Sequence, residues 1–294
     1  MTFEYATLAE RLVGDASSIV AVRSGHPAWR PLASLLGALV SERELRIVGI
    51  SGSQGSGKSS LAATLVDAVA SAHVAVGSEH SSGAPRAAAT ASLDDFYLTH
   101  KARERLAAEV HPLLQTRGVP GTHETELMER FLAAARAGTA CRVPEFDKGQ
   151  DDRVGIRELH AHHWVFEGWC LGAQPQAGAQ LTEAVNALER EEDTDGRWRS
   201  WVNRQLQGYQ PFWEQIDFWV HLRVPGFAQV EAWRYQQELA LAPTLRMSRQ
   251  EIRRFIAHYE RVTRALWAAQ PQGPGLVVTL DAQHHITSVD VVEG

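Results

Sequence analysis

The stretch LRIVGISGSQGSGKSS, residues 45–60, decides the fold of this 294-residue chain. Its first seven residues form a short, nearly continuous apolar run that is rich in β-branched side chains. Such a run is typical of a strand that is buried on both faces of a parallel sheet. A glycine-rich turn follows, and residues 59–72, SSLAATLVDAVASA, then have the composition of a good helix. The stretch therefore predicts a strand, a tight turn and a helix in succession.

The turn matches the Walker A pattern G-x-x-x-x-G-K-[ST] at every fixed position. Glycines let the backbone curl so that successive N–H groups face a phosphate, and the positive end of the following helix strengthens this anion site. In this pattern Lys58 reaches the β- and γ-phosphates of ATP, and the Ser59 hydroxyl is a ligand of Mg²⁺. The nucleotide-binding residues that we expect are Gly52, Ser53, Gln54, Gly55, Ser56, Gly57, Lys58, Ser59 and Ser60.

Further apolar runs downstream predict a mostly parallel sheet. They lie at residues 90–95 (TASLDD), 162–168 (HHWVFEG) and 216–224 (IDFWVHLRV), and helical stretches separate them. Strands that alternate with helices are typical of βαβ units. The last run, residues 275–292, predicts a terminal strand pair. We therefore expect an α/β fold of the P-loop NTPase type, a three-layer sandwich with helices on both sides of the sheet.

Two segments differ from this pattern. Residues 1–44 have leucines at helical spacing, and we expect an N-terminal helical extension that packs on a kinase domain of residues 45–294. Residues 77–89 are rich in Ser, Gly and Ala, which predicts a mobile surface loop.

Composition excludes several classes of protein. The net charge of −6 and the lack of a basic stripe argue against nucleic-acid binding. No apolar run approaches the ~20 residues that span a bilayer, and the N-terminus does not resemble a secretory signal. Cys141 and Cys170 show neither metal-ligand spacing nor a disulfide framework. We expect a cytoplasmic protein without nucleic-acid or membrane partners, and the sequence leaves the oligomeric state open.

Acidic residues follow two of the predicted strands. Asp94 and Asp95 close the run at 90–95, and Glu167 closes the run at 162–168. Ligands of open α/β sheets bind outside the carboxyl ends of the strands, and phosphoryl transfer needs a carboxylate near the metal and another that orients or deprotonates the attacking hydroxyl. We predict Asp94 as the catalytic base, also close to the metal, and Glu167 as the magnesium-side acid. The alternative for the two aspartates is a solvated turn or a helix cap.

Five segments together resemble one family. These segments, GSQGSGKSS at 52–60, SLDDFYLT at 92–99, HPLLQTRGVPGTHE at 111–124, PEFDKGQDDR at 144–153 and FEGW at 166–169, resemble the plant and fungal type of D-glycerate 3-kinase. The resemblance covers most of the chain after the first helices. The wider group includes uridine kinase, phosphoribulokinase and bacterial pantothenate kinase. DDFY is similar to the DSFY of uridine kinases, which places Asp94 at the position of their catalytic base.

The resemblance also implies an acceptor pocket. The residues that it places there are Tyr97, Arg117, His123, Asp147, Lys148 and Arg153. A carboxylate substrate gives Arg117 a physical role, because a guanidinium group holds a carboxylate through two parallel hydrogen bonds. Without the family, Arg117 reads as a surface arginine and the mixed charges of residues 147–153 read as a solvated, self-paired loop.

A lid around residues 231–255 is implied by the same resemblance. Lid arginines stabilise charge on the transferring phosphoryl group, and Arg234 and Arg246 are the candidates here. The segment WRYQQELALAPTLRMSRQEI, residues 233–252, has alanine and proline where the family usually has glycines. This departure puts lid closure in question.

The sequence thus predicts an ATP- and Mg²⁺-dependent kinase that transfers the γ-phosphate to a hydroxyl of D-glycerate. One alternative is a kinase of the same fold that acts on a nucleoside, pantothenate or a sugar. A second alternative is an ATP-binding regulatory protein with little kinase activity, which the altered lid favours.

Overall fold

A computed structural model describes residues 29–75, 87–239 and 246–293. The longer elements, in chain order, are α2 (Trp29–Glu42), β1 (Ile47–Gly52), α3 (Lys58–Ala75), β2 (Ala88–Ser92), α4 (His100–Glu109), α5 (Thr125–Ala137), β3 (Cys141–Asp147), β4 (Asp152–Leu159), β5 (His163–Gly168), α6 (Ala187–Glu192), α7 (Arg197–Trp213), β6 (Phe218–Arg223), α8 (Phe227–Leu239), α9 (Arg249–Ala268), β7 (Gly275–Leu280) and β8 (Ile286–Val292). Short 3₁₀ helices span Leu93–Phe96, Pro112–Gln115 and Gly178–Leu181. Within these described ranges, the helices are too short or too polar to cross a membrane.

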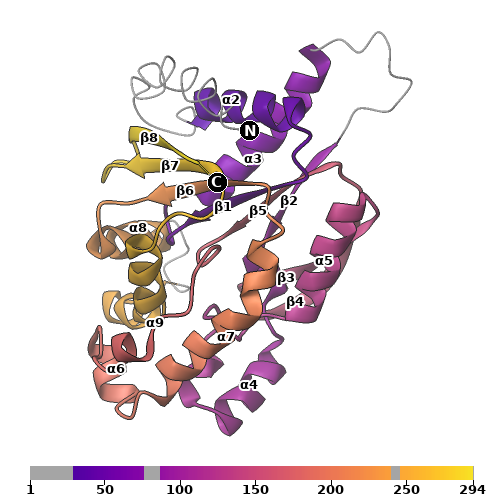
Figure 1. The fold of residues 1–294 in the computed structure, drawn as a ribbon. Helices are drawn as coiled ribbons and strands as arrows, with labels where there is room; N and C mark the ends of the chain where they lie inside the picture. Colours follow the sequence, from indigo (N-terminus) through magenta and orange to yellow (C-terminus); the bar gives the residue numbers. More distant parts are fainter. Residues whose placement is uncertain (1–28, 76–86, 240–245, 294) are drawn as a thin grey trace.

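The central sheet has six strands in the order β2-β5-β1-β6-β7-β8 (Figure 1). The first five run parallel, and β8 pairs antiparallel with β7. The expected α/β fold with a mostly parallel sheet and a terminal strand pair is therefore confirmed.

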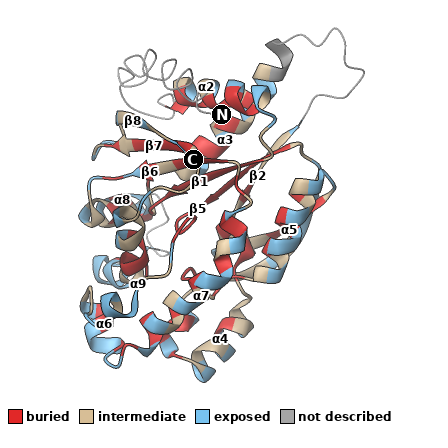
Figure 2. Ribbon diagram, in the orientation of Figure 1, coloured by how far each residue is buried: buried red, intermediate tan, exposed pale blue. Residues whose placement is uncertain are grey.

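Each face of the sheet carries its own hydrophobic core, because side chains alternate along every strand. On β1, Val48 and Ile50 face one core, whereas Ile47 faces the other. On β5, Val165 points to the first core, and Trp164 and Phe166 point to the second. Both faces are covered, so the central strands are buried along their length (Figure 2).

Helix α2 covers the first core together with α3. Its buried residues recur at helical spacing and include Leu32, Leu36 and Val40. Gly37 permits the close approach of the two helices, because a Cβ atom there would lie 2.9 Å from the backbone of Ala68. The first 28 residues of the predicted extension lie outside the described residues.

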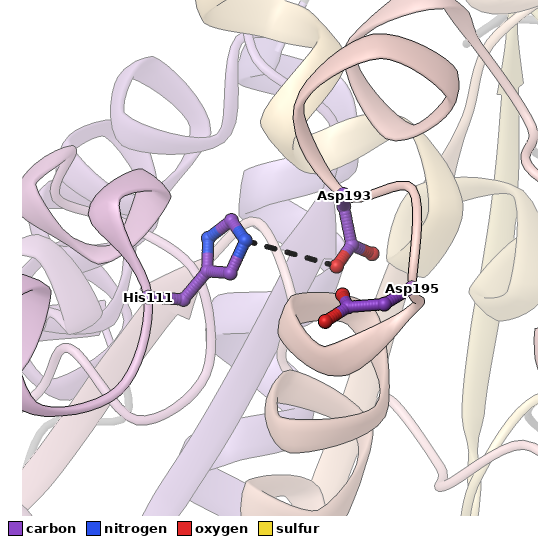
Figure 3. A group of neighbouring side chains, drawn as sticks. All are labelled: His111, Asp193 and Asp195. Atoms are coloured by element: carbon purple, nitrogen blue, oxygen red, sulfur yellow. Dashed lines mark ion pairs between the residues drawn. The ribbon is translucent and has the colours of Figure 1, made fainter.

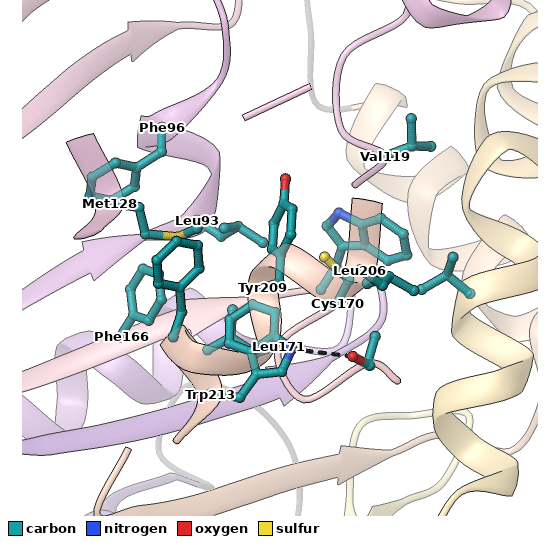
Figure 4. Close-up of a cluster of buried hydrophobic side chains, with 14 of the residues drawn as sticks. Leu93, Phe96, Val119, Met128, Phe166, Cys170, Leu171, Leu206, Tyr209 and Trp213 are labelled. Carbon is teal, nitrogen blue, oxygen red and sulfur yellow. Dashed lines mark hydrogen bonds between the residues drawn. The ribbon is translucent and has the colours of Figure 1, made fainter. Parts of the chain in front are cut away.

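The second core is rich in aromatic side chains (Figure 4). The rings of Phe131 and Trp164 meet edge to face with centroids 4.9 Å apart, and Phe96 meets Phe166 in the same way at 6.1 Å. Edge-to-face pairs add stabilisation beyond the area that they bury. The aromatic side chains thus hold α5 and the segment after β2 against the sheet.

One element was not predicted. Residues 141–159 form the antiparallel hairpin β3–β4, separate from the central sheet. Residues 147–153, whose mixed charges are typical of a solvated, self-paired loop, include the turn of this hairpin. Of the predicted loop at 77–89, residues 77–86 lie outside the described residues, whereas Ala88 and Ala89 begin β2.

We expect Leu36→Ala to lower the free energy of unfolding by about 2–5 kcal/mol, because it opens a cavity between α2 and the sheet. Ser34→Ala, at an exposed position on the same helix, is the matched control and should change stability by less than about 0.5 kcal/mol. Urea denaturation of both variants measures the difference. Equal stability of the two variants would show that α2 does not belong to the core.

Candidate active site

The register of the parallel strands brings the glycine-rich loop and the two predicted acids together. Ile50 on β1 pairs with Glu167 on β5, and Glu167 pairs on its other side with Ser92, two residues before Asp94. At the start of α3, the Ser59 hydroxyl donates a hydrogen bond of 2.8 Å to the Glu167 carboxylate. Three separate sequence segments therefore meet at one edge of the sheet.

The loop between β1 and α3 has the backbone geometry of an anion cradle. Gly55 and Gly57 adopt φ angles of 78° and 90°, which favour glycine. The Lys58 ammonium curls back and donates to the Ser53 carbonyl at 3.0 Å. The Ser53 and Ser56 hydroxyls and the Gln54 side-chain oxygen are buried without a hydrogen-bond partner. Unpartnered polar atoms in a curled glycine loop fit a phosphate chain.

The donor set beside the loop fits a magnesium ion. Mg²⁺ prefers oxygen ligands and binds proteins through one or two carboxylates together with phosphates. Ser59 and Glu167 supply a hydroxyl and a buried carboxylate side by side.

Asp94 and Asp95 have different tasks in the 3₁₀ turn after β2. Asp95 accepts a hydrogen bond of 3.0 Å from the Ser92 backbone N–H and completes a capping box. Burial raises its pKa to about 6. The helix-cap role that was the alternative for both aspartates is therefore the role of Asp95. Asp94 instead lines a cavity at this edge of the sheet.

Both carboxylate oxygens of Asp94 are hydrogen-bonded. Oδ1 accepts from the Tyr97 hydroxyl at 2.6 Å, and Oδ2 accepts from the Lys148 ammonium at 2.6 Å. Burial raises the pKa of Asp94, but the Lys148 charge and these hydrogen bonds outweigh it, so the pKa lies below its ordinary value. For Lys58, burial lowers the pKa, although Glu167 and Asp94 oppose the shift.

A cavity of about 270 Å³ lies at this edge of the sheet. It collects most of the predicted side chains from six parts of the chain. Those that line it are Gln54, Gly55, Lys58, Ser59, Asp94, Tyr97, Arg117, Lys148, Glu167 and Arg234. The arrangement places a cationic phosphate site, two carboxylates and three further cations around one space.

Three predicted acceptor residues do not line this cavity. Asp147 holds the β3–β4 turn by accepting from the backbone N–H groups of residues 149 and 150. Arg153 donates to the Tyr97 carbonyl at 3.1 Å. His123 is buried beneath Tyr97 with ring centroids 5.1 Å apart, and burial lowers its pKa to about 4. Arg153 and His123 thus contact Tyr97, and Asp147 holds the turn that carries Lys148. Their roles in substrate binding stay predictions.

Arg117 is held in place by its neighbours. Its guanidinium pairs with Asp151, which also pairs with the buried Arg103 at 2.9 Å. The Tyr259 hydroxyl donates to the Arg117 carbonyl at 2.8 Å. Two guanidinium groups thus share one carboxylate, and of these three groups Arg117 lines the cavity.

Of the predicted lid, the structure describes the two flanking helices and not residues 240–245. Arg234 on α8 pairs with Glu238 and lies over the Phe255 ring at 5.7 Å. Arg246 donates to the Leu239 carbonyl at 2.7 Å.

Several residues of the site were not predicted. Phe255 and Tyr259 of α9 and Gln237 of α8 line the cavity. In the sequence the two aromatic residues follow the spacing of an ordinary core helix, so no motif marks them.

His284, in the turn between β7 and β8, was also missed. Its Nε2–H donates to the Gly55 carbonyl at 2.7 Å, and its ring stacks on Trp233 of α8 with centroids 3.9 Å apart. The C=O and the following N–H of a trans peptide point in opposite directions. Fixing the Gly55 carbonyl therefore fixes the N–H of Ser56, which points back to the Ser53 carbonyl. The turn thus braces the phosphate loop from outside.

A second group of potential metal ligands lies outside the cavity lining (Figure 3). His111 Nε2 is 3.9 Å from Asp193, and Asp195 is close to both. His111 Nδ1 already accepts from the Leu113 backbone N–H, so the proton of the neutral ring sits on Nε2 and faces Asp193. Asp193 also accepts from Arg199 at 2.9 Å. These groups satisfy one another, and they tie the segment after α4 to the start of α7.

We expect His284→Asn to weaken ATP binding about fivefold, the equivalent of one lost hydrogen bond of ~1 kcal/mol. Asparagine tolerates the φ of 63° at this position, so the turn is kept while the contact with Gly55 is lost. Calorimetric titration with ATP measures the change, and Gln283→Ala at the exposed neighbouring position is the control. An unchanged dissociation constant for ATP in His284→Asn would show that His284 does not brace the phosphate loop.

Comparisons with known proteins agree with this geometry. The sequence matches no protein-family model. It is 34% identical over 235 residues to the uncharacterized kinase mug58 of Schizosaccharomyces pombe, covering 72% of this chain and 78% of that protein. It is 29% identical over 218 residues to the chloroplastic D-glycerate 3-kinase of Arabidopsis thaliana, covering 66% of this chain and 45% of that protein.

A solved structure extends the similarity to the whole fold. The D-glycerate 3-kinase of Cryptococcus neoformans superimposes with a TM-score of 0.73 at 26% identity, covering 90% of this chain and 99% of that one. The sequence similarity, the shared fold and the phosphate loop with its facing acids have one common explanation. This chain belongs to the family of P-loop kinases that contains the D-glycerate 3-kinases.

Proposed function

We propose that this protein is a kinase that transfers the γ-phosphate of ATP to the 3-hydroxyl of D-glycerate. The observation that carries the proposal is the convergence of Lys58, Asp94, Arg117 and Lys148 on one cavity beside the phosphate loop. The first two suit phosphoryl transfer to a hydroxyl, and the last two suit an acceptor with a carboxylate. Relatives that are named D-glycerate 3-kinase support this choice of acceptor.

The charges of the site residues indicate which of the two substrates, ATP or glycerate, each residue binds. The loop from Gly52 to Ser60 holds the phosphates, with Lys58 against their negative charge. Ser59 and Glu167 would hold Mg²⁺, which neutralises charge on the phosphate oxygens when it is bound. Arg234 supplies a further positive group from α8. Arg117 binds the glycerate carboxylate, and Asp94 orients or deprotonates its 3-hydroxyl.

A panel of acceptors tests this function. Release of ADP from Mg-ATP should rise with D-glycerate and stay near the background rate with L-glycerate, uridine and pantothenate. A rate that rises with uridine or pantothenate instead would replace the acceptor and keep the kinase. A flat response with ATP still bound would favour the regulatory alternative.

The cytoplasmic location and the lack of a nucleic-acid partner stay predictions from the sequence.

We expect Asp94→Asn to lower kcat with D-glycerate by ~10²–10⁴ while ATP binds nearly as in the wild type, because the amide does not accept the hydroxyl proton. Steady-state kinetics and calorimetric titration with ATP measure the two effects separately. Asp290→Asn, on β8 away from the cavity lining, is the control and should keep the wild-type kcat. Full activity of Asp94→Asn would refute the assignment of the base.

A further inference from the structure

Each carboxylate oxygen of Asp94 already accepts a hydrogen bond, and one of the two donors is a cation. Tyr97 donates to Oδ1 and Lys148 donates to Oδ2, each at 2.6 Å. An acceptor hydroxyl has to come within hydrogen-bond reach of one of these oxygens before Asp94 takes its proton. Each oxygen keeps a second lone pair for a hydroxyl, but the Lys148 charge 2.6 Å from Oδ2 opposes the transfer of a proton to the carboxylate. Asp94 therefore becomes a stronger base once Lys148 has moved away.

Lys148 is the donor that is able to leave. Tyr97 is only 4% exposed, and its ring is fixed between His123, at 5.1 Å, and Phe146, also at 5.1 Å. Lys148 sits in the turn between β3 and β4, and its side chain is 60% exposed. A lysine has a flexible four-carbon stem, so the ammonium group moves without any change in the backbone.

There is open space on both sides of the Lys148 side chain. A second cavity of about 290 Å³ lies beside the first, and the two share Ser59, Asp94, Lys148 and Glu167 as lining residues. Lys148 therefore stands in the wall between the two cavities, and its displacement meets no packed core.

The charge of the acceptor decides whether it displaces Lys148 from Asp94. Separating an ammonium group from a partly buried carboxylate is unfavourable unless another negative charge takes the carboxylate's place. The Asp94 charge is the largest cause of the raised pKa of Lys148, and the nearby charge of Arg117 opposes it. Lys148 and Arg117 therefore lie within electrostatic range of each other on one cavity. A carboxylate that binds between these two cations relieves their repulsion and offers Lys148 a new partner.

We propose that Lys148 masks the catalytic base until a negatively charged acceptor draws it away, so that the acceptor's charge is needed for turnover and not only for binding. This inference rests on the proposed function. Once Lys148 has moved to the carboxylate, the acceptor hydroxyl gives its proton to Asp94 and its oxygen forms the new bond to the γ-phosphorus. The bond from that phosphorus to the bridging oxygen breaks, and its electron pair leaves with ADP. A neutral polyol with the same hydroxyl leaves the base masked.

The test compares D-glycerate with glycerol, which keeps a primary hydroxyl and lacks the carboxylate. The wild type should turn over saturating glycerol at least ~100-fold more slowly than D-glycerate, in line with the loss of a general base. Lys148→Met removes both the mask and the carboxylate partner. We expect it to lower kcat/KM for D-glycerate at least tenfold and to raise kcat for glycerol roughly tenfold. A gain with the neutral acceptor is an effect that loss of a merely structural lysine does not produce.

Two controls make the result specific. Lys148→Arg keeps the positive charge beside Asp94 and should therefore not show the gain in glycerol turnover that Lys148→Met shows. Lys101→Met, at an exposed position on α4, should change neither rate. Equal melting temperatures and equal ATP dissociation constants show that the variants are folded and bind nucleotide.

The outcomes separate this proposal from the proposed function. If the wild type phosphorylates D-glycerate but Lys148→Met loses activity toward both acceptors in parallel, the mask is wrong and the kinase assignment stands. If the wild type phosphorylates neither acceptor, the proposed function fails. Turnover of glycerol by the wild type at the rate of D-glycerate would also show that Lys148 does not mask Asp94.

Discussion

Strand β5 pairs in parallel with β1 on one side and with β2 on the other, and this pairing fixes where the charged groups of the site lie. Glu167 stands opposite Ile50 and Ser92, so its carboxylate meets Ser59 from the loop after β1, and Asp94 follows from the turn after β2. A slip by one residue would send every side chain of β5 to the other face. The two cores prevent this slip, because Trp164 and Phe166 fill one and Val165 fills the other.

Outside the sheet, charged side chains are held by one another. Asp151 binds both Arg103 and Arg117, and Lys148 binds Asp94. In the proposed function, Arg117 and Lys148 beside the cavity take the acceptor carboxylate as a new partner, whereas the groups around His111 and Asp193 are paired with one another outside the cavity lining. This difference explains why the cavity, and not the similarly charged cluster beside α7, has the chemistry of a reaction site.

The sequence predicted those parts that depend on local geometry. The Gly55 and Gly57 turn, the strand before it and the helix after it follow from glycine conformation and apolar burial over 16 residues. The β3–β4 hairpin was not predicted because few apolar residues mark its strands. In β4, Val154 and Ile156 are exposed, and in β3 the buried pair Cys141 and Val143 is followed at once by Pro144, which is rare inside strands. Tyr259 and His284 reach the site only through the packing of distant elements, which no spacing in the sequence reveals. The roles of Arg117 and Lys148 came from family resemblance, and their ion pairs became visible only in the fold.

The most direct test of the account is the identity of the product. Phosphorus and carbon NMR of a reaction with Mg-ATP and D-glycerate should show the phosphate on the 3-oxygen of glycerate, in step with the release of ADP. Phosphate on the 2-oxygen would contradict the placement of the 3-hydroxyl at Asp94. Free phosphate without any phosphoglycerate would contradict the central claim that this cavity joins ATP to a hydroxy acid.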